Sequence, residues 1–425
     1  MRGRDRAFLA DLFHAAVAAA DPRELLPKHL PTPPKGRLVV IGAGKGAAQM
    51  ARAFEDLWPG PLSGVVVTRT GFGVPCMRIR VMEAAHPVPD AAGLAAAAAL
   101  RSAVTGLGPQ DLVVALICGG GSALLPAPPN GLTLDDEQAL NRALLASGAP
   151  ISVMNAVRRQ VSTLKGGRLA AAAAPAQVLT LVVSDVPGDA PEEVASGPTL
   201  PGGRTRAEVR KMVRDWRIAL PPGVARFLAG TDCPAPDARD PVFAGHEVRL
   251  IASAGQSLEA AARYARARGV PVAILSDAIE GEARDVARMH AALAREIALR
   301  DRPLARPVLL LSGGETTVTL RCEDGRGGRN AEFQLALALA AEGLPLAALA
   351  ADTDGVDGTE ANAGAFVDGR SAARMREAGV DPTTALARND AWGAFDAIGD
   401  LFSTGPTGTN VNDFRAILLR AEPSM

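Results

Sequence analysis

Short apolar runs alternate with longer helical patterns along most of this chain, and no other feature restricts its fold as much. The apolar runs lie at residues 37–41, 64–68, 79–83, 111–117, 177–183, 247–252, 271–275, 307–312, 315–321, 346–350 and 400–404. Helical spacing fills intervals at residues 45–57, 91–105, 135–146, 152–164, 255–268, 282–298 and 330–341. Strands joined by crossover helices form mainly parallel sheets. The alternation therefore predicts an α/β fold.

The length of 425 residues indicates two domains, or at most three. The weakest pattern, rich in proline and glycine, runs from Leu220 to Gly245, and domain boundaries fall in stretches of this kind. We therefore expect an N-terminal Rossmann-like domain at residues 1–235 and a second α/β domain at residues 236–425.

Composition and charge exclude several classes of protein. The net charge is −1 and no basic stripe carries interleaved aromatic residues, so nucleic acid is not an expected partner. The four cysteines are scattered, which predicts neither a disulfide framework nor a zinc site and favours a reducing compartment. The N-terminal apolar run is interrupted by Asp11 and His14, and no stretch is long enough to span a membrane. We expect a cytoplasmic protein with a small-molecule substrate; a homo-oligomer remains open.

The sequence IGAGKGAAQ, Ile41 to Gln49, follows an apolar run and opens into a helical pattern. Such a turn binds anions because its N–H groups and the helix dipole point outward. The turn fits the dinucleotide pattern G-x-G-x-x-G/A, but the next predicted strand ends without the carboxylate that this pattern requires. The P-loop of nucleoside triphosphate-binding proteins fits worse, because Lys45 stands directly between Gly44 and Gly46.

Lys45 is the informative residue of this turn. A cation at a helix N-terminus opposes the helix dipole, and an anion bound between them would remove that cost. Only five of the 45 basic residues are lysines, and a compact ammonium group suits a phosphoryl oxygen. The alternative is a solvated lysine on a tight turn.

Other predicted strands also end in glycines and polar residues, and ligands of such folds bind outside the carboxyl ends of the strands. Backbone N–H groups or side chains that would hold nucleotide phosphates are expected at Gly42, Gly44, Gly46, Gly119, Gly120, Gly121, Ser122, Lys165, Gly313, Gly314 and Glu315. Arg329, in the loop GRGGRN, suits a carboxylate or a phosphoryl group. His86, in HPVPD, is expected to be structural.

Acidic residues at the strand ends are candidates for proton transfer or for magnesium binding. Asp185, Asp352 and Asp354 are the candidate metal ligands, and Asp189 is the candidate catalytic carboxylate. Each is equally consistent with a solvated turn. An EF-hand is excluded for the loop that begins at Asp352, because its twelfth position is Ala363 instead of a glutamate.

Taken in order, the segments GAGKGA, HPVPD, GGGSALL, MNAVRRQVSTLKGGRLA, SDVPGD, SGGETTVTL, GRGGRNAEFQLA, DTDGVDGT and PTGTNVND resemble the class II glycerate 2-kinases, whose C-terminal half is a MOFRL-type α/β domain. The resemblance extends from about residue 5 to about residue 420. It implies phosphorylation of D-glycerate at the 2-hydroxyl to 2-phosphoglycerate, with ATP and Mg²⁺, in a cleft between two α/β domains. The family's catalytic lysine and arginine match Lys45 and Arg329.

A hydride-transfer enzyme is the alternative, because proteins of this kind have also been called hydroxypyruvate reductases. Only the G-x-G-x-x-A turn at residues 42–47 supports it. The missing carboxylate weakens NAD binding, whereas Arg69 keeps NADP conceivable.

Overall fold

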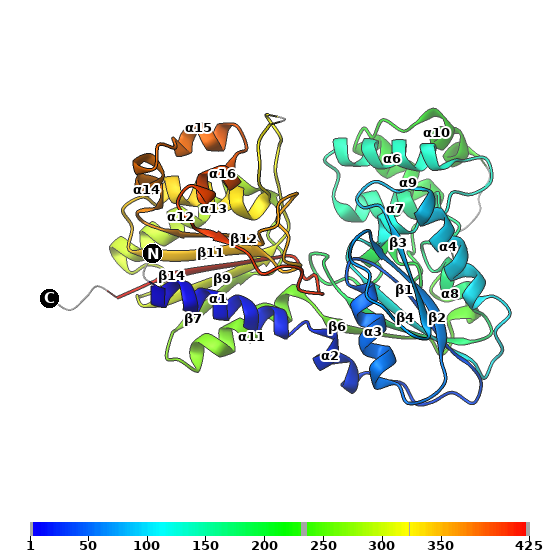
Figure 1. Ribbon diagram of the computed structural model, residues 1–425. Helices are drawn as coiled ribbons and strands as arrows, with labels where there is room; N and C mark the ends of the chain where they lie inside the picture. The colour runs from blue at the N-terminus through cyan, green and yellow to red at the C-terminus, as the bar shows by residue number, and fades with distance from the viewer. Residues whose placement is uncertain (1–2, 231–235, 323, 422–425) are drawn as a thin grey trace. The chain divides into compact units, whose positions relative to one another are not determined.

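The computed structural model describes residues 3–230, 236–322 and 324–421, which form two compact units (Figure 1). One unit contains residues 22–251, and the other joins residues 3–21 to residues 252–421. The expected N-terminal domain was residues 1–235; the observed unit instead starts at residue 22 and ends at residue 251. The N-terminal helix α1 (Gly3–Ala18) belongs to the second unit because it buries Leu9 and Phe13 in that unit's core.

The unit of residues 22–251 is built on a six-stranded sheet. Its strands, in the spatial order β3-β2-β1-β4-β5-β6, are Ile79–Ala84, Ser63–Arg69, Leu38–Ala43, Leu112–Cys118, Gln177–Val183 and Glu247–Ala252. Strands β1 to β5 pair in parallel, as expected. The strand order changes direction between β1 and β4, so the loops that follow these two strands emerge side by side.

Helices of this unit fall into two groups. The first contacts the sheet or shares its hydrophobic core and includes α3 (Ala47–Leu57), α4 (Ala91–Val104) and the short α5 (Gly121–Leu124) and α8 (Arg168–Ala171). The second group packs around Leu140, Val157 and Val209. It consists of α6 (Leu134–Ala146), α7 (Ile151–Gln160), α9 (Arg206–Asp215) and α10 (Pro222–Ala229). The remaining short helix is α2 (Pro22–Leu25).

The second unit contains a sheet that is mostly antiparallel. Its strands, in the order β13-β12-β11-β14-β9-β7, are Leu401–Phe402, Gly364–Asp368, Leu346–Asp352, Asp413–Leu419, Val308–Gly314 and Val272–Ser276. Only β7 and β9 pair in parallel, and the other four pairings are antiparallel. The two-unit α/β class is therefore confirmed, but the expectation of mainly parallel strands is wrong for this unit.

The reversal comes from two strands that the sequence did not predict. β12 follows β11 through residues 353–363, which contain no crossover helix, and β14 runs between β9 and β11 in the opposite direction. The strand expected at residues 315–321 is reduced to β10 (Thr316–Thr317), which pairs with β8 (Gly281–Glu282). Asp413 consequently starts β14 beside the end of β9 and the end of β11.

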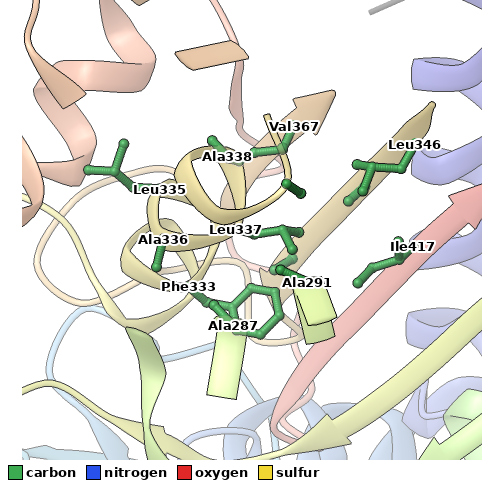
Figure 2. Packing of buried hydrophobic residues seen from close by; sticks show 14 of the residues in the cluster. Ala287, Ala291, Phe333, Leu335, Ala336, Leu337, Ala338, Leu346, Val367 and Ile417 are labelled. Atoms are coloured by element: carbon green, nitrogen blue, oxygen red, sulfur yellow. The ribbon is translucent and has the colours of Figure 1, made fainter. Parts of the chain in front are cut away.

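Helices cover both faces of this sheet. On one face, α1 and α11 (Ala254–Arg266) pack against Leu309 and Leu311. On the other face, α12 (Ala283–Arg300) and α13 (Arg329–Ala340) pack against the alternate residues of β9. Figure 2 shows this core, where Phe333 of α13 lies next to Ala287 of α12. Truncating a buried phenylalanine to alanine costs about 3–5 kcal/mol, so this packing fixes the start of α13 firmly.

Three short helices complete this unit: α14 (Ser371–Glu377), α15 (Pro382–Ala387) and α16 (Ala391–Asp396). Within the described ranges, the chain has no helix whose length and apolar character would allow it to cross a membrane.

Candidate active site

The glycine turn after β1 is closed by its own hydrogen bonds. The N–H of Lys45 donates to the carbonyl oxygen of Gly119 (2.8 Å), and the N–H of Gly46 donates to the sulfur of Cys118 (3.2 Å). The N–H of Gly44 donates to a carbonyl oxygen of β2 at 3.2 Å. These N–H groups are therefore committed to the protein and do not point at a ligand.

The glycines of this turn serve close packing instead. Gly44 has φ +134°, and a Cβ atom there would lie 2.3 Å from the carbonyl oxygen of Cys118. A Cβ atom at Gly42 would lie 2.7 Å from the carbonyl oxygen of Leu116. The phosphate contacts expected of Gly42, Gly44 and Gly46 stay predictions, and the internal hydrogen bonds of Gly44 and Gly46 argue against them.

The glycine turn after β4 is different. Gly120 adopts the left-handed conformation, with φ +78°. Within the described ranges, the N–H groups of Gly120 and Gly121 donate to no other backbone or side-chain group. Consecutive N–H groups in such a turn form a concave site for an anion. Donors were expected at both turns; the N–H groups of the second turn are the ones that no other described group accepts, and their contact with phosphate stays a prediction.

Lys45 reaches this second turn from the first. A Cβ atom at Gly120 would lie 3.1 Å from Cγ of Lys45 and 3.0 Å from Nε2 of His86. Both side chains are half-buried. The structure thus brings a lysine, a histidine and the N–H groups of a glycine turn together at the ends of β1, β3 and β4. His86 was expected to be structural, and that expectation stays a prediction, although its imidazole lies beside Gly120.

Asp185 lies at the same edge of the sheet, in the loop after β5. Burial raises the pKa of the Cys118 thiol to about 12; the nearby Asp185 carboxylate acts in the same direction, and the N–H of Gly46 and the charge of Lys45 act against it. Lys45 and Asp185 therefore both lie within electrostatic reach of one sulfur atom. Asp189 ends this loop in the left-handed conformation, with φ +54°, and its catalytic role stays a prediction.

Lys165 lies in a different environment from Lys45. Its side chain is 1 % exposed, and its Nζ pairs with the Glu137 carboxylate at 2.8 Å. Breaking a buried pair of this kind is strongly destabilising. This placement argues against the nucleotide contact expected for Lys165. The ion pair instead links the segment around Lys165 to helix α6.

Arg329, the first residue of α13, is held by three carboxylates. Its Nε donates to Asp413 (2.7 Å), its Nη1 to Glu315 (2.9 Å) and its Nη2 to Asp352 (2.8 Å). Burial opposes the charge of Arg329, but the three carboxylates raise its pKa well above the ordinary value. Arg329 is therefore a fixed cation in a site that already holds its counter-charges.

Asp413 is the centre of this cluster and was missed by the sequence. It also accepts a hydrogen bond from Nδ2 of Asn330 (2.8 Å) and pairs with Arg415. Although burial acts to raise the pKa of Asp413, the guanidinium groups of Arg329 and Arg415 hold it below the ordinary value. Asp413 joins the site only because β14 runs between β9 and β11, and the sequence did not predict that strand.

The predicted metal ligands of this unit have other partners. Asp352 accepts from Arg329 through Oδ2 and from the N–H of Asp354 through Oδ1 (3.0 Å). Asp354 in turn accepts from the N–H of Val356 at 2.9 Å. Within the described ranges, no three histidine, cysteine or acidic side chains are grouped as a metal centre would require. Arginine and backbone donors thus occupy both oxygens of Asp352 and one of Asp354, and Mg²⁺ binding by these two residues stays a prediction.

The glycines that end β9 are explained by packing. Gly314 has φ +117°, and a Cβ atom there would lie 2.2 Å from the nitrogen of Ile279. The carbonyl oxygen of Gly313 accepts from Ile279 (3.1 Å) and from Arg415 (3.3 Å). Glu315 is engaged with Arg329, so the nucleotide contacts expected of these three residues stay predictions.

The fold and these two clusters define a class: an α/β protein of two units, each with a cation among polar groups at its strand ends. Residues 8–229 match DUF4147, a domain of unknown function, and residues 308–413 match the MOFRL family. The chain belongs to the family that these two domains define, which includes the glycerate 2-kinases.

Similar proteins carry two kinds of name. A putative hydroxypyruvate reductase of Agrobacterium vitis is 50% identical over 418 residues, which cover 97% of this chain and 94% of the relative. The glycerate 2-kinase of Pyrococcus horikoshii is 38% identical over 381 residues, covering 89% and 86%. The crystal structure of glycerate kinase from Thermotoga maritima matches with a TM-score of 0.84 at 35% identity, covering 97% and 99%. The family resemblance seen in the sequence is confirmed.

Proposed function

We propose that this protein phosphorylates D-glycerate at its 2-hydroxyl with ATP, giving 2-phosphoglycerate and ADP. The observation that carries the proposal is the placement of Lys45 over the open Gly120 turn. Phosphoryl transfer asks a protein mainly for positioning and for neutralisation of charge, and this cluster offers both. The glycerate kinase names of similar proteins support the same reaction.

In the unit of residues 22–251, the N–H groups of Gly120 and Gly121 would hold oxygens of the phosphate chain. The Lys45 ammonium would stabilise the charge that develops on the transferring group. Donors fixed in advance at such a point are worth about 10²–10³ in rate. His86, beside Gly120, is a further candidate for contact with the reacting groups.

In the other unit, Arg329 would bind a carboxylate or a phosphoryl oxygen. Its three carboxylate partners use three of the five N–H groups of a guanidinium. Glu315 is the most exposed of the three, with 47 % of its side chain accessible, so an incoming anion would replace Glu315 first.

Mg²⁺ would arrive with the nucleotide, since it is usually bound by substrate phosphates and only one or two protein carboxylates. Asp185, half-buried and near Lys45, fits that requirement better than Asp352 or Asp354. The ion would neutralise phosphate charge. A reaction that uses free ATP agrees with the cytoplasmic location expected from the sequence.

The second candidate is reduction of hydroxypyruvate, which the names of the Agrobacterium vitis relatives suggest. A dinucleotide fingerprint needs N–H groups that face the pyrophosphate and an acidic residue at the end of the second strand. The N–H groups of Gly44, Lys45 and Gly46 are used internally, and β2 ends at Arg69. These observations favour the kinase.

The test is a coupled assay of the purified protein with D-glycerate, ATP and Mg²⁺ that resolves 2-phosphoglycerate from 3-phosphoglycerate. A parallel assay contains hydroxypyruvate with NADH or NADPH. We expect 2-phosphoglycerate and ADP in equal amounts and no oxidation of nicotinamide. Nicotinamide oxidation without ADP would overturn the proposal in favour of the reductase.

A further inference from the structure

A chain of hydrogen bonds runs from the open glycine turn into the interior of the unit of residues 22–251. The Ser122 hydroxyl, directly after Gly121, lies 2.8 Å from the Ser196 hydroxyl. Ser196 donates to Oδ1 of Asn155 at 2.9 Å. Ser196 and Asn155 are buried, whereas Ser122 is half-buried at the turn. The direction in which these hydrogen bonds are donated decides whether Ser122 can act as a donor or as an acceptor for a ligand.

The orientation of the Asn155 amide is fixed by its other partners. Oδ1 accepts from Nη1 of Arg158 at 3.1 Å, and an arginine can only donate. Nδ2 donates to the carbonyl oxygen of Glu193 (3.0 Å) and to its carboxylate (2.9 Å), and these oxygens can only accept. Turning the amide over would place a donor against the Arg158 donor and an acceptor against the acceptor oxygens of Glu193. The atom that faces Ser196 is therefore an acceptor.

The direction of the whole chain follows from that acceptor. A hydroxyl carries one proton, and Ser196 gives its proton to Asn155. The oxygen of Ser196 can then only accept from Ser122, since two lone pairs at 2.8 Å would repel each other. Ser122 therefore donates its proton to Ser196, and its oxygen offers only lone pairs to a ligand that binds at the turn.

The backbone holds this arrangement in place. Ala195, Ser196 and Gly197 all have positive φ, at +54°, +60° and +58°. Each such non-glycine residue costs about 1–3 kcal/mol and persists only where its surroundings impose it. Ala195 also packs against the turn, because its Cβ would lie 2.7 Å from a Cβ atom at Gly121. The orientation of the Ser122 hydroxyl is therefore set before a ligand binds.

We propose that Ser122 accepts a hydrogen bond from the non-reacting 3-hydroxyl of D-glycerate and so distinguishes this substrate from 2-hydroxy acids without that group. The inference rests on the proposed function. An oxygen that only accepts suits a hydroxyl and repels a phosphate, so the anion contact expected of Ser122 from the sequence is replaced by this role. Ser122 does not serve as the base for the reacting hydroxyl, because the chain ends on an amide that takes up no proton at neutral pH.

The test compares D-glycerate with D-lactate, which is the same 2-hydroxy acid without the 3-hydroxyl. D-Lactate is measured as a competitive inhibitor of D-glycerate phosphorylation. In Ser122→Ala we expect KM for D-glycerate to rise roughly 10-fold, because the substrate hydroxyl loses its acceptor, with little change in kcat. The inhibition constant of D-lactate should stay within about twofold of the wild-type value.

Two further variants separate selectivity from general damage. Ser196→Ala leaves the Ser122 proton free to turn toward the ligand, so KM for D-glycerate should rise by a smaller factor while D-lactate inhibition again stays constant. Thr180→Val is the matched control, since Thr180 donates to the Thr199 hydroxyl at 2.9 Å inside the same unit without joining the chain. It should lower the melting temperature and leave both constants unchanged.

The possible outcomes are distinct. An equal rise of the D-glycerate and D-lactate constants in Ser122→Ala would overturn the inference, as would no change in either. A wild-type protein that forms no 2-phosphoglycerate would overturn the proposed function itself.

Discussion

The two units present their cations in opposite settings. Lys45 lies beside a glycine turn whose N–H groups donate to no other group of the described residues, and the Asp185 carboxylate lies nearby. Arg329 lies among Asp413, Glu315 and Asp352, so that cluster already contains the anions it can bind. An anion beside Lys45 can also use the N–H groups of Gly120 and Gly121, whereas an anion at Arg329 has to replace one of its carboxylate partners.

This difference predicts which of the two cations contributes to the stability of the fold. Lys45 is half-buried, whereas Arg329 is tied to a fully buried carboxylate, so we expect the fold to tolerate the loss of Lys45 better. Removing Arg329 leaves the carboxylate of Asp413, which is 2 % exposed, short of one of its two guanidinium partners. We therefore expect variants at these two residues to affect stability in very different ways.

Arg329→Gln should have the largest effect, because it changes both activity and stability. Removing one partner of a buried ion pair costs about 3–5 kcal/mol. Asp413 now has a lowered pKa, so its stabilisation is present above its unfolded-state pKa and is lost on acidification. In the variant the pKa of Asp413 rises, and the deficit should shrink as the pH falls from 7 toward 4.

Denaturant unfolding at several pH values measures this change. Arg326→Gln is the matched control, because Arg326 stands in the same loop and pairs with Glu360 at half-exposed positions. An equal deficit at every pH would show that Arg329 acts through packing and not through its charge.

Lys45→Met should reduce kcat by about 10²–10³ while the melting temperature stays close to that of the wild type. Lys45→Arg should restore little activity, because a planar guanidinium does not replace a compact ammonium beside Gly120. Lys211→Met, at an exposed lysine of α9 that pairs with Asp215, is the control and should leave kcat unchanged. Near-wild-type turnover in Lys45→Met would show that Lys45 has no role in catalysis. The comparison of the two units as two parts of one active site would then fail.

The sequence predicted one unit better than the other, for a physical reason. Strands of the 22–251 unit are apolar runs joined by helices, and both features are visible in local periodicity. Strand β14 reads DFRAILL, and its polar Asp413 and Arg415 interrupt the apolar run. Both are buried because they pair with each other, and Asp413 also pairs with Arg329. The second pair is a tertiary contact that no local pattern encodes.

The same limit applies to the site residues. Lys45 and Arg329 could be predicted because each cation follows a glycine at the start of a helical pattern. Which turn offers its N–H groups could not be predicted, since that depends on the approach of β4 to Gly44 within the folded sheet. The proton direction at Ser122 likewise depends on Arg158 and Glu193, which are distant in sequence.

The buried Asp357 carboxylate makes the stability of the second unit depend on pH. Burial raises its pKa to about 6, against the backbone N–H groups of Asn330 and Ala331 that favour its charged form. A folded-state pKa above the unfolded value contributes stability that is present below about pH 4 and is lost as the pH rises through 6. The contribution is about 2–3 kcal/mol at most.

His290, in the same unit, acts in the opposite direction. Burial lowers its pKa to about 4, so its neutral form stabilises the fold above pH 6.5 and that stability is lost on acidification. The measurement is therefore the difference in unfolding free energy between the wild type and Asp357→Asn from pH 4 to 7. We expect the wild type to gain on the variant as the pH falls; a constant difference would contradict the raised pKa.

Glu315→Gln should have the smallest effect and the opposite sign from the other changes. Because Glu315 competes with an incoming anion for Nη1 of Arg329, its neutral analogue should lower KM for one of the two anionic substrates by roughly 2- to 5-fold. The substrate whose KM falls is the one that Arg329 binds, so the variant also assigns Arg329 to ATP or to glycerate. Glu360→Gln is the matched control, since Glu360 pairs with Arg326 and not with Arg329. A higher KM in Glu315→Gln would mean that Glu315 orients Arg329 for binding, and the second site would then be as ready for its ligand as the first.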